Sequence, residues 1–386
     1  MDPVLAETLT RWRRHLHANP GLTLHEGATA AFVVEKLKEL GVTDIAEGVG
    51  GHGVVATLHR PGSNRSVGLR GDMDALPIEE AAQDLPWRST VPNVMHACGH
   101  DGHTTALLGA AALLQRDENW SGTVRLVFQP AEEGGGGANR MIEDGLFQRF
   151  PMDRIFGWHN WPGLEAGTVA VHDSAVMAAG NRFLIEIEGH AGHAALPHLA
   201  RDPIVAAGHA IVACQSIVAR SLDPMDTGVV SLTVVNGGEA QNQIAARVRI
   251  QGSMRYLRNE VGDQIKDGLR RVAAGVSATF GVKAEAVIQG GVPVTANHPA
   301  EAEMAAEAAE VVTKVRRHMA PAMTGEDFSH FLHHVPGAFV WIGNGSAEGG
   351  RELHNPHYDF NDAVLPAASG FLAEIARRSL AKEQGA

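Results

Sequence analysis

The order of strand-like and helix-like segments constrains the fold of this chain more than any other feature of its sequence. Short apolar segments predict strands at residues 54–58, 66–69, 123–128 and 154–158. Helical patterns with stop or capping signals lie before and between them, at residues 5–17, 30–40, 102–114 and 139–144. Strands that alternate with helices favour an α/β fold with a mostly parallel sheet covered by helices.

The pattern changes near residue 181 and changes back near residue 290. Strands are expected at 183–188, 228–235, 245–254 and 283–288, and helices at 203–219 and 260–280. This β-α-β-β-α-β order is the ferredoxin-like arrangement. Helix–strand alternation then resumes at 300–315, 338–342 and 363–380. The sequence therefore predicts one α/β domain, residues 1–180 plus 291–386, interrupted by a ferredoxin-like domain of residues 181–290.

Charge and cysteine content narrow the classes of function. The 386 residues include 32 basic and 44 acidic side chains, a formal net charge of −12, with no basic block. We therefore expect neither nucleic acid nor an anionic membrane as a partner. Two cysteines cannot form a disulfide framework, which favours a reducing compartment such as the cytoplasm. The sequence has no run of about 18 apolar residues, so we expect no membrane span.

Histidine is abundant, with 21 residues, and the densest group is Met95–His103. If this stretch is extended, Cys98 and His100 point the same way. Thiolate and imidazole are good ligands for zinc and similar divalent ions, and Asp101 could orient the ring of a histidine ligand. The alternative is the start of a helix, with a buried cysteine and a capping aspartate.

Three further groups add potential ligands. Glu132 and Glu133 follow a strand and precede four glycines, so one could bind a metal while the other holds a water; a solvated acidic turn is the alternative. His159 ends a strand, where ligand sites of open α/β sheets lie, and His354 lies in a glycine-rich region. Each histidine alone is weak support for a site.

Together these residues would form a set of five ligands: Cys98, His100, Glu133, His159 and His354. Five are too many for one tetrahedral ion and suit two ions that share a ligand. A thiolate can bridge two metals.

The sequence also resembles a known family over nearly its whole length. The motifs that carry the resemblance are residues 13–20, Gly71–Pro77, His96–Asp101, Gln129–Glu133, Gly325–Phe328 and Leu353-His354. The family comprises dinuclear metal-dependent amidohydrolases, among them hippurate hydrolase, N-acyl-amino-acid amidohydrolases, indole-acetyl-amino-acid hydrolases and related carboxypeptidases.

The resemblance implies a role for each residue of the site. Cys98 would bridge two ions; His100 and His159 would complete one site, and Glu133 and His354 the other. Glu132 would be the general base, and Asp74 would support the ligands from behind. Asp72 stands where the wider superfamily has a metal-binding histidine, so it is left out of the ligand set.

The resemblance extends to the inserted domain. His193, in the loop 189–198, matches a histidine that reaches the active site of the partner subunit, where it would stabilise the oxyanion. Asn242 and Arg255 match residues that hold the substrate carboxylate, a task that suits the arginine fork. The alternative for His193 is a polar loop residue without a role in the site, and the alternative for Arg255 is an ion pair at the surface. A homodimer or larger homo-oligomer through this domain is implied.

The predicted reaction is hydrolysis of the amide bond of an N-acyl amino acid or short peptide. Two divalent ions per chain are expected, and zinc, manganese, cobalt or nickel would all suit the mixed ligands. One alternative is a thiol hydrolase, with Cys98 as nucleophile and His100 or His103 as base. Another is a protein that binds a metal or ligand without catalysis.

Overall fold

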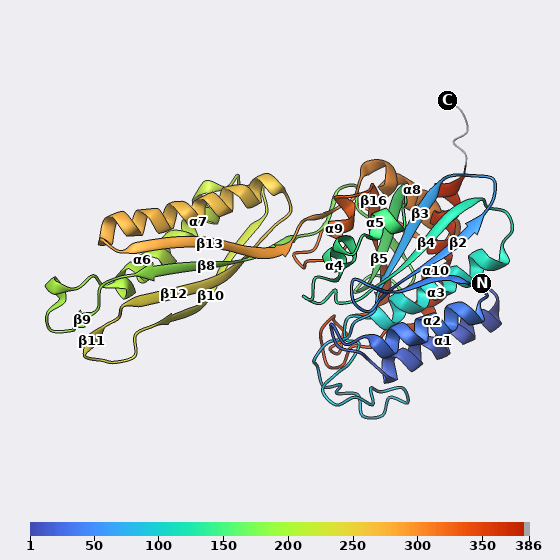
Figure 1. Cartoon of the computed structure of the whole chain (residues 1–386), viewed down its shortest axis with the longest axis horizontal. Helices are drawn as coiled ribbons and strands as arrows, with labels where there is room; N and C mark the ends of the chain where they lie inside the picture. The colour runs from blue at the N-terminus through green and yellow to red at the C-terminus, as the bar shows by residue number, and fades with distance from the viewer. Residues whose placement is uncertain (382–386) are drawn as a thin grey trace. The chain divides into compact units, whose positions relative to one another are not determined.

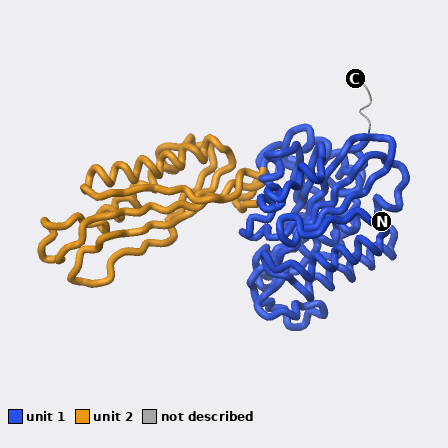
Figure 2. The backbone as a smooth tube through the Cα atoms, viewed as in Figure 1, with its two compact units in different colours: residues 1–176, 296–320, 327–386 blue, residues 177–295, 321–326 orange. Residues whose placement is uncertain are grey.

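The computed structural model describes residues 1–381, which divide into two compact units (Figure 2). Among the described residues, the first unit contains 1–176, 296–320 and 327–381. The second contains residues 177–295 together with 321–326. The main segment of the second unit thus begins at residue 177 and ends at residue 295. The inserted domain predicted from the sequence begins at 181 and ends at 290.

A mixed sheet of eight strands forms the centre of the first unit (Figure 1). Its strands are β1 (Asp44–Val49), β2 (Gly53–Arg60), β3 (Ser66–Asp72), β4 (Gly122–Gln129), β5 (Arg154–Pro162), β6 (Val169–Val171), β15 (Val315–Arg317) and β16 (Gly337–Gly345). Their order is β1-β2-β4-β3-β5-β16-β6-β15. The central neighbours β4, β3, β5 and β16 all run parallel, as the alternating pattern predicts.

The first unit has helices that follow the predicted segments, with ends that differ by a few residues, and two four-residue helices, at 146–149 and 329–332, that were not predicted. They are α1 (Pro3–Ala18), α2 (Gly27–Glu39), α3 (His100–Arg116), α4 (Gly137–Glu143), α5 (Leu146–Arg149), α8 (Pro299–Val312), α9 (Ser329–Leu332) and α10 (Leu365–Leu380). The short strands β1, β6 and β15 were not predicted, because segments of three to six residues carry little periodicity.

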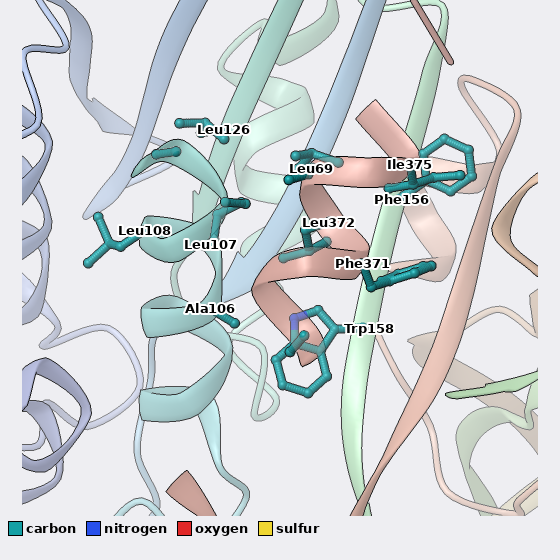
Figure 3. Packing of buried hydrophobic residues seen from close by; sticks show 14 of the residues in the cluster. Leu69, Ala106, Leu107, Leu108, Leu126, Phe156, Trp158, Phe371, Leu372 and Ile375 are labelled. Atoms are coloured by element: carbon teal, nitrogen blue, oxygen red, sulfur yellow. The ribbon is translucent and has the colours of Figure 1, made fainter. Parts of the chain in front are cut away.

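The core of the first unit lies between its sheet and the helices α3 and α10 (Figure 3). Apolar side chains of the central strands meet apolar side chains of both helices; among them are Leu69, Leu126, Phe156, Trp158, Leu107, Phe371, Leu372 and Ile375. Burial of such side chains contributes about 1.5–3 kcal/mol each. This packing holds the carboxyl ends of β3, β4 and β5 side by side.

The second unit has the ferredoxin-like order that the sequence predicts. Its elements are β8 (Ala179–Glu188), α6 (Pro203–Ser216), β10 (Gly228–Gly237), β12 (Arg247–Tyr256), α7 (Asn259–Phe280) and β13 (Lys283–Val292). The four strands form an antiparallel sheet in the order β10-β12-β8-β13. A small ribbon, β9 (Gly192–His193) paired with β11 (Gln243–Ile244), extends the unit.

One helical run of the second unit is unusually apolar. By length and composition Pro203–Ser221, which is α6 with its final turn, could cross a membrane, although core helices of soluble proteins satisfy the same criterion. The run was expected to be an ordinary helix. Its buried side chains pack on the sheet and on α7, and Ile204, Val205 and Val212 are exposed.

Candidate metal centre

The predicted ligands meet where the parallel strands of the first unit end. Glu132 and Glu133 follow β4, and His159 lies near the end of β5. Because β4, β3 and β5 are neighbours, their carboxyl ends share one edge of the sheet. Cys98 and His100 reach this edge from the start of α3.

The chain around Cys98 is not extended but has the alternative conformation, the start of a helix that follows a buried cysteine. Gly99 adopts a left-handed conformation (φ 89°) as N-cap, and α3 begins at His100. The turn nevertheless brings Cys98 Sγ and the His100 ring to the same side, because both join one group of potential ligand atoms with His159. Cys98 Sγ lies 3.3 Å from His159 Nε2.

A second group shares Cys98 and adds Glu133 and His354, again with all ligand atoms within 4.8 Å of one another. Glu133 Oε1 lies 3.1 Å from His354 Nε2. His354 has a left-handed backbone (φ 64°) and its N–H donates to Ala97 O at 2.8 Å. The five predicted ligands thus form two overlapping sets of three, joined at the thiol.

Hydrogen bonds orient the two buried histidines of the first group. The Nδ1–H of His100 donates to the backbone carbonyl of Asp74 at 2.8 Å, and that of His159 donates to Asn160 O at 2.7 Å. Each ring therefore directs Nε2 towards the site, and this nitrogen can bind a metal once it has lost its proton. Asp101, expected to orient a ligand, instead accepts a hydrogen bond from His17 Nδ1 at 2.8 Å.

The site is strongly negative. Burial alone would lower the pKa of His100, but the carboxylates of Asp72, Asp74 and Glu133 raise it to about 10. The buried Nε2 of His100 has no hydrogen-bond partner in the described structure. An unpartnered buried nitrogen beside carboxylates and a thiol fits a bound divalent cation, which would satisfy all of them at once.

Asp74 supports the carboxylate pair through the backbone. Its Oδ1 accepts the N–H of Glu132 and its Oδ2 the N–H of Glu133, both at 3.0 Å, and Thr23 Oγ1 donates to Oδ2 at 2.7 Å. The side chain of Glu132 accepts the N–H of Asp327 at 3.3 Å. Asp74 is therefore placed behind the ligands, and its carbonyl orients His100 as well.

Asp72 and His103 belong to a buried network behind the site. Asp72 accepts hydrogen bonds from Arg70 Nη1 at 2.7 Å and from His103 Nδ1 at 2.6 Å. His103 Nε2 in turn accepts the N–H of Asn160 at 3.0 Å. With both ring nitrogens occupied, His103 has no lone pair left for a metal or for a proton from Cys98.

The environment of Cys98 opposes the thiol-hydrolase alternative. Burial raises the pKa of the thiol well above its usual value, and the carboxylates of Glu133, Glu132 and Asp72 raise it further. A cysteine nucleophile needs the opposite setting, in which positive groups lower its pKa. A bound dication would reverse this effect and favour the thiolate as a ligand.

Two residues of the site carried no predicted role. Asn160 donates through Nδ2 to Cys98 O at 2.6 Å and accepts from Tyr358 Oη at 2.7 Å, so it holds the loop that carries Cys98. Asp327 accepts from Gln129 Nε2 at 2.7 Å and from Ala138 N at 3.0 Å. Asn160 directly follows His159, and Asp327 lies in the motif Gly325–Phe328, but these positions in the sequence do not indicate the contacts.

The residues predicted in the inserted domain lie at two places within the second unit. His193 lies in the exposed β9–β11 ribbon, and the N–H of Ala194 donates to Asn242 O at 3.0 Å. Arg255 lies at the other end of β12, opposite Gly180 of β8. β12 begins at Arg247, a few residues after Asn242. Eight residues of extended strand separate Arg247 from Arg255, a distance of about 27 Å. One chain therefore does not bring Asn242 and Arg255 to a common carboxylate.

Comparisons with known proteins agree with this geometry. The profile of peptidase family M20/M25/M40 matches residues 68–378. The chain is 40% identical over 384 residues to an N-acetyl-L-cysteine deacetylase of Bacillus subtilis, covering 98% of this chain and 91% of that one. It is also 40% identical over 371 residues to a hippurate hydrolase of Campylobacter jejuni, covering 95% of each.

A solved structure adds the metal content of a relative. The chain matches a dinuclear metal-binding peptidase of Bacillus subtilis with a TM-score of 0.87 and 34% identity, covering 98% of this chain and 99% of that one. The shared fold at this identity extends over both units.

Proposed function

Because the chain belongs to peptidase family M20/M25/M40 and is a metal-dependent amidohydrolase, we propose that it hydrolyses N-acyl amino acids with a free α-carboxylate. The products are a carboxylic acid and an amino acid. The observation that carries this proposal is the pair of ligand groups that share Cys98, with Glu132 beside them. The deacetylase and hippurate hydrolase relatives support acetyl or benzoyl as the acyl group.

Two divalent ions are the proposed cofactors. Cys98, His100 and His159 would hold one ion, and Cys98, Glu133 and His354 the other. Ions bound there would polarise the acyl carbonyl and lower the pKa of a water. Thiolate, imidazole and carboxylate together suit zinc, manganese, cobalt or nickel.

Glu132 is the proposed general base. Its carboxylate accepts the N–H of Asp327 and lies within 4.8 Å of the potential ligand atoms of His100 and Glu133, so it adjoins the attacking water without being needed as a ligand. Glu132 would take a proton from this water and return it to the leaving amine. A purely binding site needs no such additional carboxylate.

His193 is suited to donate a hydrogen bond to the oxyanion. Its Nδ1 accepts the N–H of Ala195 at 3.1 Å, so the neutral ring carries its proton on Nε2, at an exposed position. Asn242 neighbours it in the ribbon, whereas Arg255 lies at the far end of β12. We propose that His193 and Asn242 of one subunit act with Arg255 and the metal ligands of its partner.

A homodimer through the second unit would allow this exchange. The edge strand β10 pairs only with β12 among the described residues, and exposes Val229, Val234 and Val235. The outer face of α6 exposes Ile204, Val205 and Val212. An unpaired strand edge beside an apolar helix face suits a two-fold contact with a second copy.

Metal content and hydrolysis test the proposed function together. We expect about two divalent ions per chain by elemental analysis, and hydrolysis of N-acetyl- and N-benzoyl-amino acids that chelation abolishes and added divalent ions restore. Esters of the same substrates, which lack the free carboxylate, should be poor substrates. Activity that survives complete removal of metal would overturn the proposal.

A further inference from the structure

Glu26, which no predicted role includes, joins two distant segments of the first unit. Its side chain is fully buried, and it precedes α2 as N-cap residue. One oxygen, Oε1, accepts the N–H of Leu24 at 2.8 Å and the N–H of Ala131 at 2.9 Å. Ala131 is the residue immediately before the carboxylate pair.

Both of these donors have a strained backbone. Leu24 has φ 68° and Ala131 has φ 54°, a left-handed conformation that is unfavourable for residues with a Cβ. Such conformations persist only where the surroundings hold them, and they cluster at functional sites. A single carboxyl oxygen of Glu26 bonds to both strained residues.

The contact continues into the next two residues of the turn. The N–H groups of Glu132 and Glu133 donate to Asp74, so three successive N–H groups donate to two buried carboxyl groups. Thr23 also donates to Asp74. The short segment from Thr23 to Glu26 therefore anchors the whole turn that carries the two carboxylates.

We propose that Glu26 is a positioning residue for Glu132 and Glu133. It holds Ala131 in the left-handed conformation that directs Glu132 towards the attacking water and Glu133 towards the metal. Without this acceptor Ala131 relaxes to negative φ, and the backbone that carries both carboxylates rotates. This inference rests on the roles proposed above for Glu132 and Glu133.

Replacement of Glu26 should affect catalysis and metal binding more than substrate binding. In Glu26→Ala we expect kcat to fall about 100-fold, because a displacement of about 1 Å has that effect. KM should change less than about threefold. Affinity for Zn²⁺ or Mn²⁺, measured by competition with a chromophoric chelator, should fall about 10- to 100-fold.

Conservative variants separate positioning from packing. Burial raises the pKa of Glu26, and a neutral acid, a carboxylate or an amide all offer an acceptor oxygen. Glu26→Gln should therefore keep kcat within about tenfold of wild type. Glu26→Asp fills the site but is too short to reach both N–H groups, so its kcat should fall like that of Glu26→Ala. Glu26→Gln and Glu26→Asp also test the proposal if Glu26→Ala does not fold.

A second substitution at Ala131 gives the decisive measurement. Glycine adopts positive φ without strain, so Ala131→Gly added to Glu26→Ala should recover at least about tenfold in kcat and in metal affinity. If Glu26 only fills space in the core, glycine at 131 recovers neither. Glu301→Ala is the matched control, because Glu301 is also a buried carboxylate. It pairs with Arg154 at 3.0 Å and has no contact with the turn among the hydrogen bonds and ion pairs described for it.

Different results would overturn the positioning role of Glu26 and the catalytic role of Glu132. Wild-type kcat and metal affinity in Glu26→Ala or Glu26→Asp, or absence of recovery in the double variant, overturn the positioning role of Glu26. An active Glu132→Gln variant overturns instead the proposed role of Glu132 as base.

Discussion

At the residue scale, the function of each histidine depends on which ring nitrogen is already bonded. His100 and His159 donate through Nδ1 to backbone carbonyls and keep Nε2 for a metal. His103, only three residues from His100, has both nitrogens bonded within the protein. Three histidines in similar sequence contexts thus divide into two that have a ring nitrogen available to a metal and one that has none.

Glu132 provides the first test at this scale. We expect Glu132→Gln to lower kcat by about 10²- to 10⁴-fold, because the amide cannot take up a proton. Both metal ions should remain bound, since Glu132 belongs to neither of the two groups that share Cys98. Elemental analysis measures the bound metal and steady-state kinetics measure kcat, with a substitution of the exposed Glu143, Glu143→Gln, as control. Loss of metal together with activity would make Glu132 a ligand instead.

His17 predicts a pH-dependent contribution to stability. Burial alone would lower its pKa, but hydrogen bonds to Asp101 and Glu80 raise it from 6.5 to about 9. A raised pKa means that the protonated ring stabilises the fold below pH 6.5 and that this contribution disappears as pH rises through about 9.

Denaturant unfolding of wild type and His17→Gln between pH 6 and 10 measures this contribution. The difference in free energy of unfolding should be largest, up to a few kcal/mol, at the acidic end and should decrease towards the alkaline end. A difference that is constant with pH would show that folding does not shift the pKa of His17.

At the element scale, the start of α3 determines the geometry of the site. Gly99 ends the loop that carries Cys98, and His100 opens the helix. A Cβ at Gly99 would lie 2.4 Å from both Asn160 Nδ2 and Tyr358 Oη. The left-handed turn and the close contact together explain how ligands from a loop and a helix point to the same place.

Gly99→Ala should therefore weaken both stability and metal binding. Its matched control is Gly163→Ala, which has nearly the same φ (88° against 89°) but nothing within 4 Å of the new Cβ. We expect Gly99→Ala to lower the free energy of unfolding by about 1–3 kcal/mol more than the control does. It should also lower metal affinity, whereas the control should not. Equal effects would mean that only the backbone conformation matters.

At the scale of the whole molecule, the substrate roles proposed for Asn242 and Arg255 imply that two chains share one site, because the two residues lie near opposite ends of β12. This predicts complementation between two inactive variants, Glu132→Gln and His193→Ala. In a mixed dimer, one site combines the intact Glu132 of one chain with the intact His193 of the other. Random exchange of subunits should then restore about one quarter of wild-type activity.

The oligomeric state provides the control for that experiment. Val235→Lys places a charge on the exposed edge strand β10 and should shift the protein towards monomers in sedimentation, with loss of activity. When Val235→Lys is added to both inactive variants, mixing them should not restore activity. If mixing restores nothing although subunits exchange, His193 acts within its own chain or not at all.

Short-range patterns were enough to predict much of this protein. The alternation of strands and helices, the ferredoxin-like order of the second unit and the ligand types at Cys98, Glu133 and His159 are all local properties of the sequence. Helix ends were close because caps and stop signals act over a few residues. The sequence did not decide between an extended stretch and a helix start at Cys98–His100, because residue alternation does not show the left-handed turn at Gly99.

Tertiary structure decided which of these groups meet and what each is free to do. Asp101 bonds to His17 rather than to a ligand, and Asp72 is occupied by Arg70 and His103. Glu26 meets Ala131 across more than a hundred residues of sequence. The number of hydrogen bonds that a side chain can make is set by its chemistry, but its partners are set by packing between distant segments. Residue types therefore identify the chemistry, and the fold assigns each residue its part in it.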